Sequence, residues 1–130
     1  MTPYEEVRYL LQRYGRAADD RDLDALAALF HPDAEITGSR GRQTRDEFLD
    51  TMRGPRAFPS SMHMVGDPLI THEEGAAEAT ADTYAVVYQL GDAAAGQGDL
   101  TLGMRYLDEL MVDGGRWVIR RRTSTMVWMR

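Results

Sequence analysis

The first third of the chain carries hydrophobic residues at the spacing that is typical of helices. Thr2 can cap a helix, Pro3 fits the first helical position, and Glu5 completes a capping box, so we expect a helix from residue 3 to about residue 18. Its hydrophobic residues recur three and four positions apart, which places them on one stripe of the helix. They are Val7, Leu10, Leu11, Tyr14 and Ala18.

Two further helices and a short strand are expected before residue 60. Asp22 is placed to cap the second helix, which ends at the sequence His31-Pro32-Asp33. Residues 34–37 indicate a short strand, residues 38–41 a turn, and residues 44–52 a third helix. The hydrophobic residues of these two helices are Leu23, Leu26, Ala27, Leu29 and Phe30 in the second, and Phe48, Leu49 and Met52 in the third.

From Ser60 onward the hydrophobic pattern changes to the alternation of strands. We expect four long strands, at residues 60–72, 76–90, 100–112 and 116–128. The last two are separated by a Gly-Gly turn, which favours a hairpin. Helices followed by a run of antiparallel strands indicate an α+β domain, in which helices cover one face of a curved sheet.

Composition narrows the class of protein. A chain of 130 residues, 43% of them hydrophobic, is expected to form a single domain over residues 1–130, with a core and one enclosed pocket. There is no cysteine, so disulfides, thiolate nucleophiles and Cys-ligated metals are excluded, and no His or carboxylate cluster has metal-binding spacing. The net charge of −6 argues against nucleic acid as a partner. Without a long hydrophobic run or a basic leader, we expect a cytoplasmic protein with no membrane contact.

Four segments of the sequence resemble the SnoaL-like branch of the nuclear transport factor two superfamily, which also holds scytalone dehydratase, ketosteroid isomerase and bile-acid dehydratase. They are residues 14–36, His63, residues 105–109 and residues 114–121, so the resemblance extends over nearly the whole chain. It implies a cone-shaped α+β barrel, in which N-terminal helices pack on a strongly curved, mainly antiparallel sheet. It also implies a pocket at the mouth of the cone and a homodimer formed through the sheet.

The resemblance implies a His-Asp dyad formed by Asp19 and His63. In the dehydratases and dehydrochlorinases of this superfamily, an Asp ends the first helix and a His lies on the strand after the third helix. An imidazole, with an ordinary pKa of about 6.5, can take and return a proton near neutral pH. A carboxylate partner fixes its tautomer and stabilises the imidazolium. We therefore expect neither a metal nor a cofactor.

Further site residues follow from the same resemblance. Tyr14 stands five residues before Asp19, as in the bile-acid dehydratase pattern, where a phenol can donate a hydrogen bond to a carbonyl or a leaving hydroxyl. Alternation with Trp117 and Ile119 makes Arg121 the arginine expected to point inward. The other residues expected to line the pocket are Phe30, Phe58, Tyr84, Tyr88, Met104, Tyr106 and Trp128.

Each of the three catalytic candidates also has a structural interpretation. Asp19 lies about 120° round the helix from the hydrophobic stripe, so the pattern alone would leave it as one solvated acid among several. His63, between two methionines, could be a satisfied core residue. Tyr14 lies on the buried stripe and could be core filler.

We expect a cofactor-independent lyase or isomerase that acts on a hydrophobic, polycyclic or aromatic small molecule, with dehydration as the preferred reaction. Isomerisation and the cyclisation of polyketides begin with the same proton transfer and remain alternatives. A second possibility is a binding or scaffold domain without catalysis. A third is an epoxide hydrolase of the limonene type, with Asp82 or Asp108 in an Asp-Arg-Asp arrangement.

Overall fold

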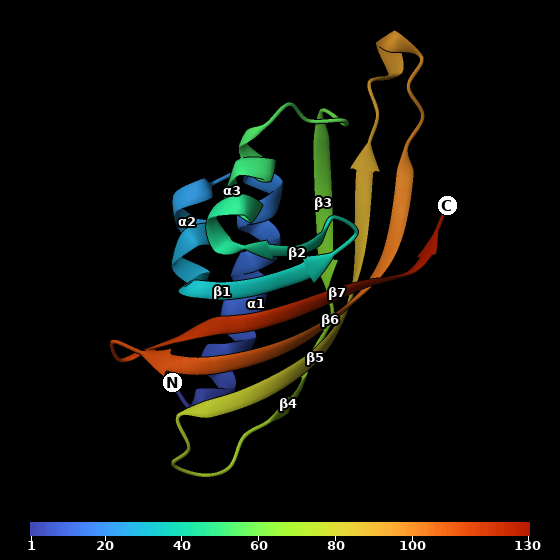
Figure 1. Cartoon of the computed structure of the whole chain (residues 1–130). Helices are drawn as coiled ribbons and strands as arrows, with labels where there is room; N and C mark the ends of the chain where they lie inside the picture. Colours follow the sequence, from blue (N-terminus) through green and yellow to red (C-terminus); the bar gives the residue numbers. More distant parts are fainter.

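The computed structural model describes residues 1–130 and shows three helices packed against one face of a curved sheet (Figure 1). The helices are α1 (Pro3–Asp20), α2 (Leu23–Leu29) and α3 (Arg45–Arg53), with one 3-10 turn at Ala93–Ala95. The strands are β1 (Phe30–Gly38), β2 (Gly41–Thr44), β3 (Ser60–Val65), β4 (Leu69–Thr71), β5 (Glu78–Leu90), β6 (Leu100–Asp113) and β7 (Arg116–Met129).

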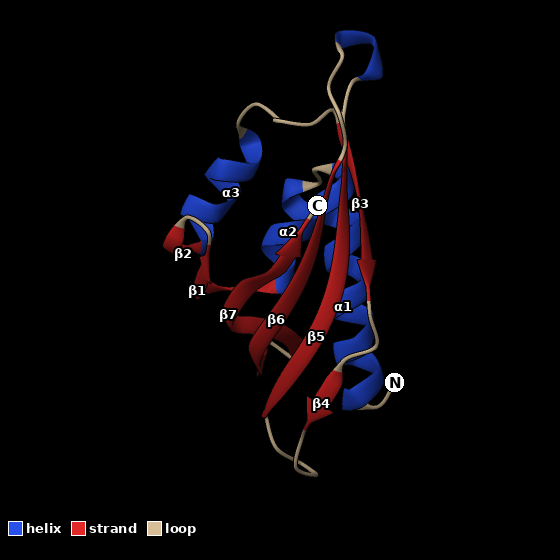
Figure 2. Cartoon of the chain, turned by 90° about the vertical axis from the view of Figure 1, so that its right-hand side faces the viewer, coloured by secondary structure: helices blue, strands red, loops and turns tan.

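The strands form one seven-stranded sheet in the order β2-β1-β7-β6-β5-β3, and β4 pairs with β5 beside β3. All neighbours are antiparallel except β1 and β7, which run parallel. The long strands β5, β6 and β7 bend round the helices, and Figure 2 shows the helices on one side of the sheet only. The expected α+β fold with a curved, mainly antiparallel sheet is confirmed, although the sheet stays open between its edges β2 and β3.

The predicted helix starts are confirmed by their caps. The Thr2 hydroxyl accepts a hydrogen bond from the Glu5 N–H at 3.1 Å, and the Asp22 side chain accepts one from the Ala25 N–H at 3.1 Å. Helix α3 begins with a capping box between Thr44 and Glu47, in which each side chain bonds the other residue's backbone. Each cap satisfies N–H groups that a helix start otherwise leaves unpaired.

The strand expected over residues 60–72 is two strands, β3 and β4. The break falls at Gly66, whose N–H donates to the Tyr84 carbonyl at 2.8 Å. A Cβ at Gly66 would stand 2.9 Å from that oxygen, so the chain needs glycine here. Two other boundaries also differ from expectation: β1 begins at Phe30 because this residue pairs with Ile119 of β7, and residues 41–44 form strand β2.

The hydrophobic core fills the space between the helices and the inner face of the sheet. Alternation along β5 directs Ala79, Ala81, Ala85 and Val87 inward, and each is at least 93% buried. These small side chains leave room for the hydrophobic stripe of α1, whose Val7 and Leu11 are almost fully buried. Residues between them in the sequence, such as Tyr84, lie on the outer face, which no helix covers.

Candidate active site

His63 and Asp19 meet at the junction of β3 with the end of α1. The His63 Nδ1 lies 2.6 Å from the Asp19 Oδ1, and the His63 backbone N–H donates to the Asp19 Oδ2 at 2.8 Å. The carboxylate therefore holds both the ring and the backbone of the histidine. Both side chains are largely buried, with 12% of His63 and 19% of Asp19 exposed.

Three residues on one flank of α1 fix this junction. Gln12, at the start of the flank, donates from its Nε2 to the Val65 carbonyl at 3.0 Å. Gly15 follows one turn later, where a Cβ would stand 3.0 Å from the Val65 Cγ2 and 3.2 Å from the His63 Cβ. Asp19 follows after another turn. Because residues three and four apart share a helix face, these contacts align α1 with β3 from Val65 to Ser61.

Asp19 also accepts a hydrogen bond from Ser61, a residue that no sequence pattern singles out. The Ser61 hydroxyl donates to the Asp19 Oδ1 at 2.8 Å. Burial by itself raises the pKa of Asp19. The hydrogen bonds from the His63 backbone, the His63 ring and Ser61, together with the charge of His63, outweigh burial and hold the pKa of Asp19 below its ordinary 3.8. Asp19 is therefore a carboxylate at neutral pH.

This geometry determines which nitrogen of His63 is available for chemistry. Because Nδ1 faces a carboxylate, it carries the proton, and Nε2 is left with the lone pair of a base. The Tyr14 ring packs edge-on against the imidazole, with the ring centroids 6.0 Å apart. The structure thus brings together all three predicted catalytic residues, Asp19, His63 and Tyr14.

A buried ion pair between Arg122 and Asp108 packs against the face of the Tyr14 ring. Arg122 donates from Nε and Nη2 to the two carboxylate oxygens of Asp108, at 2.7 and 2.9 Å. Its guanidinium carbon lies 4.1 Å from the Tyr14 ring centroid and 4.3 Å from that of Tyr106. Burial alone would lower the pKa of Arg122, but the charge of Asp108 and its hydrogen bonds raise it, so the cation persists in the core.

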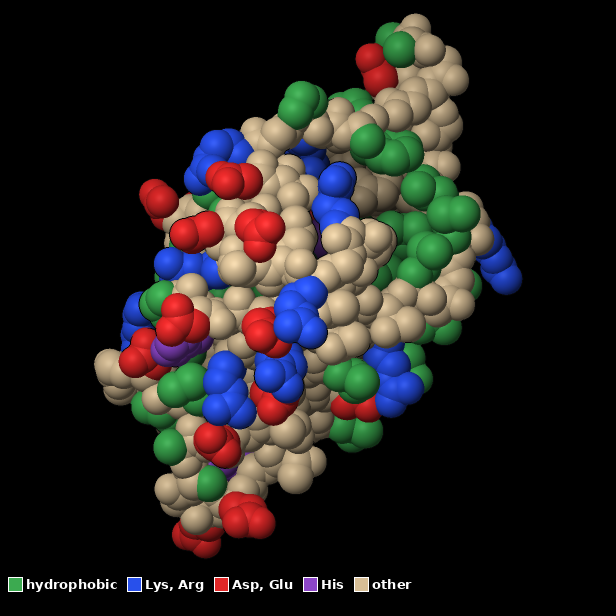
Figure 3. Space-filling model, viewed as in Figure 1, with side chains coloured by type: hydrophobic (Ala, Val, Ile, Leu, Met, Phe, Trp, Pro, Cys, Tyr) green, Lys and Arg blue, Asp and Glu red, His purple; other side chains and the backbone are tan.

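The prediction that Arg121 points inward is wrong. Arg121 is 57% exposed and forms ion pairs with Glu35 and Glu109 on the outer face, where Figure 3 shows blue and red side chains alternating. The inward arginine is Arg122, which is 2% exposed. A β-bulge explains the exchange: Glu109 pairs with Arg121 but Leu110 pairs with Ile119, so the extra residue Arg120 reverses the alternation.

Three of the aromatic residues expected in the pocket are also on the other face. Tyr84 and Tyr88 alternate with the inward residues of β5, and Tyr84 is 61% exposed. Trp128 lies across Gly103, which leaves room for its indole on the outer face. For these three residues the predicted contact with the inner site is wrong.

The remaining predicted pocket residues lie on the inner side or beside it. Phe30 and Tyr106 are buried, and each packs edge-on against Tyr14. Met104 is half-buried against the core, and Phe58 is half-buried in the segment before β3. Phe30, Tyr106 and Met104 therefore form the hydrophobic side of the site.

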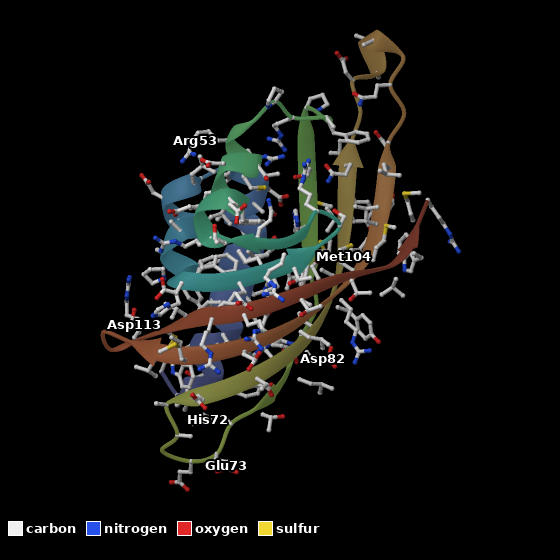
Figure 4. The ribbon with its side chains drawn as sticks, in the orientation of Figure 1. Arg53, His72, Glu73, Asp82, Met104 and Asp113 are labelled. Atoms are coloured by element: carbon white, nitrogen blue, oxygen red, sulfur yellow. The ribbon has the colours of Figure 1, made fainter.

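The Asp-Arg-Asp arrangement is not assembled. Asp108 and Arg122 are paired inside, whereas Asp82 lies on the outer face, bonded to Arg105 at 2.9 and 2.5 Å. Figure 4 shows Asp82 on the side of β5 that turns away from the helices. The two carboxylates thus lie on opposite faces of the sheet.

The surface hollows lie away from the His63–Asp19 pair, and the chain forms no cluster of side chains of the kind that holds a metal ion. Four hollows of about 250 to 550 Å³ open over α1, α2 and the β4 end of the sheet, and neither Asp19 nor His63 lines any of them. The expectation of an enclosed pocket at the pair is not met by these hollows. No three His, Asp or Glu side chains gather as they would around a metal ion. None of the helices is both long and apolar enough to cross a membrane.

Comparisons with known proteins agree on the architecture. The profile of the SnoaL-like domain family matches residues 1–123. A scytalone dehydratase-like protein from Novosphingobium aromaticivorans superposes with a TM-score of 0.84 at 21% identity, covering 100% of this chain and 91% of that one. A hexachlorocyclohexane dehydrochlorinase (LinA type 2) superposes with a TM-score of 0.83 at 15% identity, covering 97% and 86%.

An NTF2-like protein with a cystatin-like fold, also from Novosphingobium aromaticivorans, superposes with a TM-score of 0.81 at 24% identity, covering 95% of this chain and 80% of that one. At these identities the likeness shows the fold alone. A search of curated protein sequences finds no significant match.

Proposed function

The chain belongs to the SnoaL-like domain family, and within this fold we propose that it is a cofactor-independent lyase. The proposed reaction is a dehydration of a hydrophobic, polycyclic or aromatic small molecule. The observation that carries the proposal is the 2.6 Å contact between the His63 Nδ1 and the Asp19 Oδ1, which leaves Nε2 as a base. The enzymes among the structural neighbours support a lyase-type reaction on this fold.

In the proposed reaction, His63 moves a proton twice. Its Nε2 takes a proton from the carbon next to a substrate carbonyl, and the C–H electron pair forms an enolate. Asp19 stabilises the resulting imidazolium through the Nδ1 hydrogen bond. The enolate then reforms the carbonyl and expels the β-hydroxyl, which leaves as water with the proton that Nε2 returns.

Tyr14 has a second role in this proposal. A phenol that packs against the imidazole edge can donate a hydrogen bond to the oxygen on which the enolate charge develops. The cation of Arg122 lies below the Tyr14 ring. It favours this donation, because a phenol that donates a hydrogen bond gains negative charge, which a nearby cation stabilises. Isomerisation and polyketide cyclisation would use the same first step.

Proton abstraction can be tested without knowing the substrate. The probe is 2-tetralone, a bicyclic ketone whose exchange of carbon-bound hydrogen in D2O is followed by proton NMR. We expect the protein to accelerate exchange, and His63→Ala to reduce the acceleration by about 10²-fold or more. His72→Gln, at the far end of the sheet, is the matched control (Figure 4). Equal exchange by the wild type and His63→Ala would overturn the proposal that His63 is the base.

A binding or scaffold role without catalysis is the second candidate function, and one observation favours it: the hollows described above do not reach His63.

The outer face of the sheet exposes hydrophobic side chains that a partner could cover under either function. We define the outer apolar patch as Met62, Met64, Tyr84, Leu107 and Trp128, each at least 39% exposed.

The occupant proposed for this patch is a second copy of the chain, which gives a homodimer through the sheet. Light scattering after gel filtration should then report a mass of twice 14.6 kDa. Met64→Lys in the patch should shift the mass to that of the monomer, whereas Met1→Lys, outside the patch, should not. A wild-type monomer at high concentration would contradict the dimer.

A further inference from the structure

We infer that Arg21 and Arg56 bind a carboxylate group carried by the substrate, beside the His63–Asp19 pair. That the ligand is the substrate rests on the proposed function, but carboxylate binding at the two arginines can be tested without catalysis. It follows from two half-buried cations that have no acidic partner in the chain.

Arg56 lies against the residues that hold His63. Its Nη1 approaches the Asp19 carbonyl at 3.5 Å, and its Nη2 approaches the Ser61 hydroxyl at 3.4 Å. Both distances are at the long end of the range for hydrogen bonds. Its Nε is buried and has no hydrogen-bond partner. Arg56 therefore lies beside the proposed catalytic pair with most of its donors weakly used.

Arg21 reaches the same region from the end of α1. It caps the helix with φ 51°, the only residue other than glycine with a positive φ, a conformation that carries a steric cost. Its Nη1 donates to the carbonyl and the sulfur of Met52 on α3, at 3.3 and 2.9 Å. Its Nε is also buried and has no partner. Neutral acceptors are all that Arg21 contacts.

The two guanidiniums lie near the same end of α1, because Arg56 approaches the carbonyl of Asp19, two residues before Arg21. They repel each other: burial lowers the pKa of Arg21, and the positive charge of Arg56 lowers it further. Asp19, the acidic residue whose carbonyl Arg56 approaches, already bonds His63 and Ser61 through its carboxylate. The chain has 21 acidic side chains and 15 basic ones, yet neither of these two arginines has an acidic partner. Their repulsion and partial burial lower the stability of the fold, and a bound anion would remove this cost.

The chemistry of these donors favours a carboxylate. A guanidinium presents paired N–H groups in a plane that matches the two oxygens of a carboxylate, and two guanidiniums can share one such group. The reacting carbon of the ligand would lie near His63, and its hydrophobic part would meet the half-buried Met104 rather than Phe30 and Tyr106, which are 2% and 4% exposed. The substrate class is thus a hydrophobic aromatic or polycyclic acid.

Paired probes that differ only in charge test this site. Binding of 2-naphthoate and of 2-naphthamide is measured by calorimetry on the full chain. We expect the acid to bind at least about tenfold more tightly than the amide. Arg56→Gln and Arg21→Gln should each bring the ratio towards one. Arg53→Gln is the matched control, because Arg53 pairs with Asp50 at the exposed end of α3 and should leave the ratio unchanged (Figure 4).

Three outcomes would overturn the inference. The first is equal affinity of the wild type for acid and amide. The second is a preference for the acid that survives in both variants, with thermal unfolding confirming that they are folded. The third is displacement of naphthoate by inorganic phosphate but not by acetate, which would assign the site to phosphate.

A further variant separates this inference from the proposed catalysis. His63→Ala should keep the preference for naphthoate while it loses exchange of 2-tetralone. Loss of the preference for naphthoate in folded Arg56→Gln would support the carboxylate site whatever the exchange rate of that variant. Absence of exchange in the wild type with an intact preference would overturn only the catalytic one.

Discussion

Gly15 of α1 and His63 of β3 are so close that a methyl group on the glycine would stand 3.2 Å from the histidine Cβ. No other residue type allows the helix to approach the strand to this distance without displacement. The 2.6 Å contact between Asp19 and His63 lies one turn further along the same helix. The glycine therefore sets the spacing on which the contact between the acid and the imidazole depends.

Gly15→Ala tests this spacing. The added methyl must push against Val65 and His63, and overpacking of this kind costs about 1–3 kcal/mol. The higher helix propensity of alanine offsets at most about 1 kcal/mol of that cost. We expect a lower free energy of unfolding in urea and slower exchange of 2-tetralone. Gly98→Ala, where a Cβ meets nothing within 4 Å, should change neither.

Asp19→Asn should disable His63 without unfolding the protein. An amide in place of the carboxylate no longer stabilises the imidazolium and no longer fixes the proton on Nδ1. We expect exchange of 2-tetralone to fall by about 10²-fold or more. Asp20→Asn removes a charge at the neighbouring exposed position, and its rate should match the wild type. If both variants kept the wild-type rate, the role of Asp19 would be structural.

The low pKa of Asp19 links its contacts to stability at acid pH. A carboxyl whose pKa is lowered in the folded state adds stability above its unfolded pKa of 3.8 and loses it as the pH falls through the folded value. The difference in unfolding free energy between wild type and Asp19→Asn should therefore be constant near neutral pH and shrink below about pH 4. Urea titrations between pH 2.5 and 7 measure it. A difference in unfolding free energy that grew towards acid pH would contradict a lowered pKa of Asp19 in the folded state.

The buried pair of Arg122 and Asp108 should behave as a unit. Arg122→Met leaves the Asp108 carboxylate buried and unpaired, which costs about 3–5 kcal/mol. Adding Asp108→Leu removes that charge, so the double variant should recover most of the stability. A thermal or urea double-mutant cycle measures the coupling. Because the double variant also removes the cation below Tyr14, it should be folded but slower in exchange.

The sequence indicated the helix starts accurately because their signals are local, whereas the second helix was expected to include Phe30 and ends at Leu29. Caps at Thr2 and Thr44 involve residues three positions apart, and their geometry does not depend on the rest of the fold. The pairing of β1 with β7 has no such local signal. It starts the first strand at Phe30, four residues before the expected position.

The faces of the strands were harder to predict. Alternation shows which residues of β5 share a face but does not say which face is buried. Size favoured the tyrosines, yet the alanines lie inside, in the same core cluster as the hydrophobic stripe of α1. The position of Asp19 had a signal that periodicity of hydrophobic residues overlooks, since Gln12, Gly15 and Asp19 share one flank of the helix.

The bulge at Arg120 bends β7 and makes Arg122, instead of Arg121, the inward residue. Removing Arg120 would restore simple alternation, in which Ile119 points in, Arg121 points out and Arg122 points in, as now. The guanidinium beneath the tyrosines would keep its place, and only the bend of the strand would relax. One extra residue thus bends the strand and adds a cation to the outer face, where Arg120 pairs with Glu78 and Glu109, while Arg122 keeps its position beneath the tyrosines.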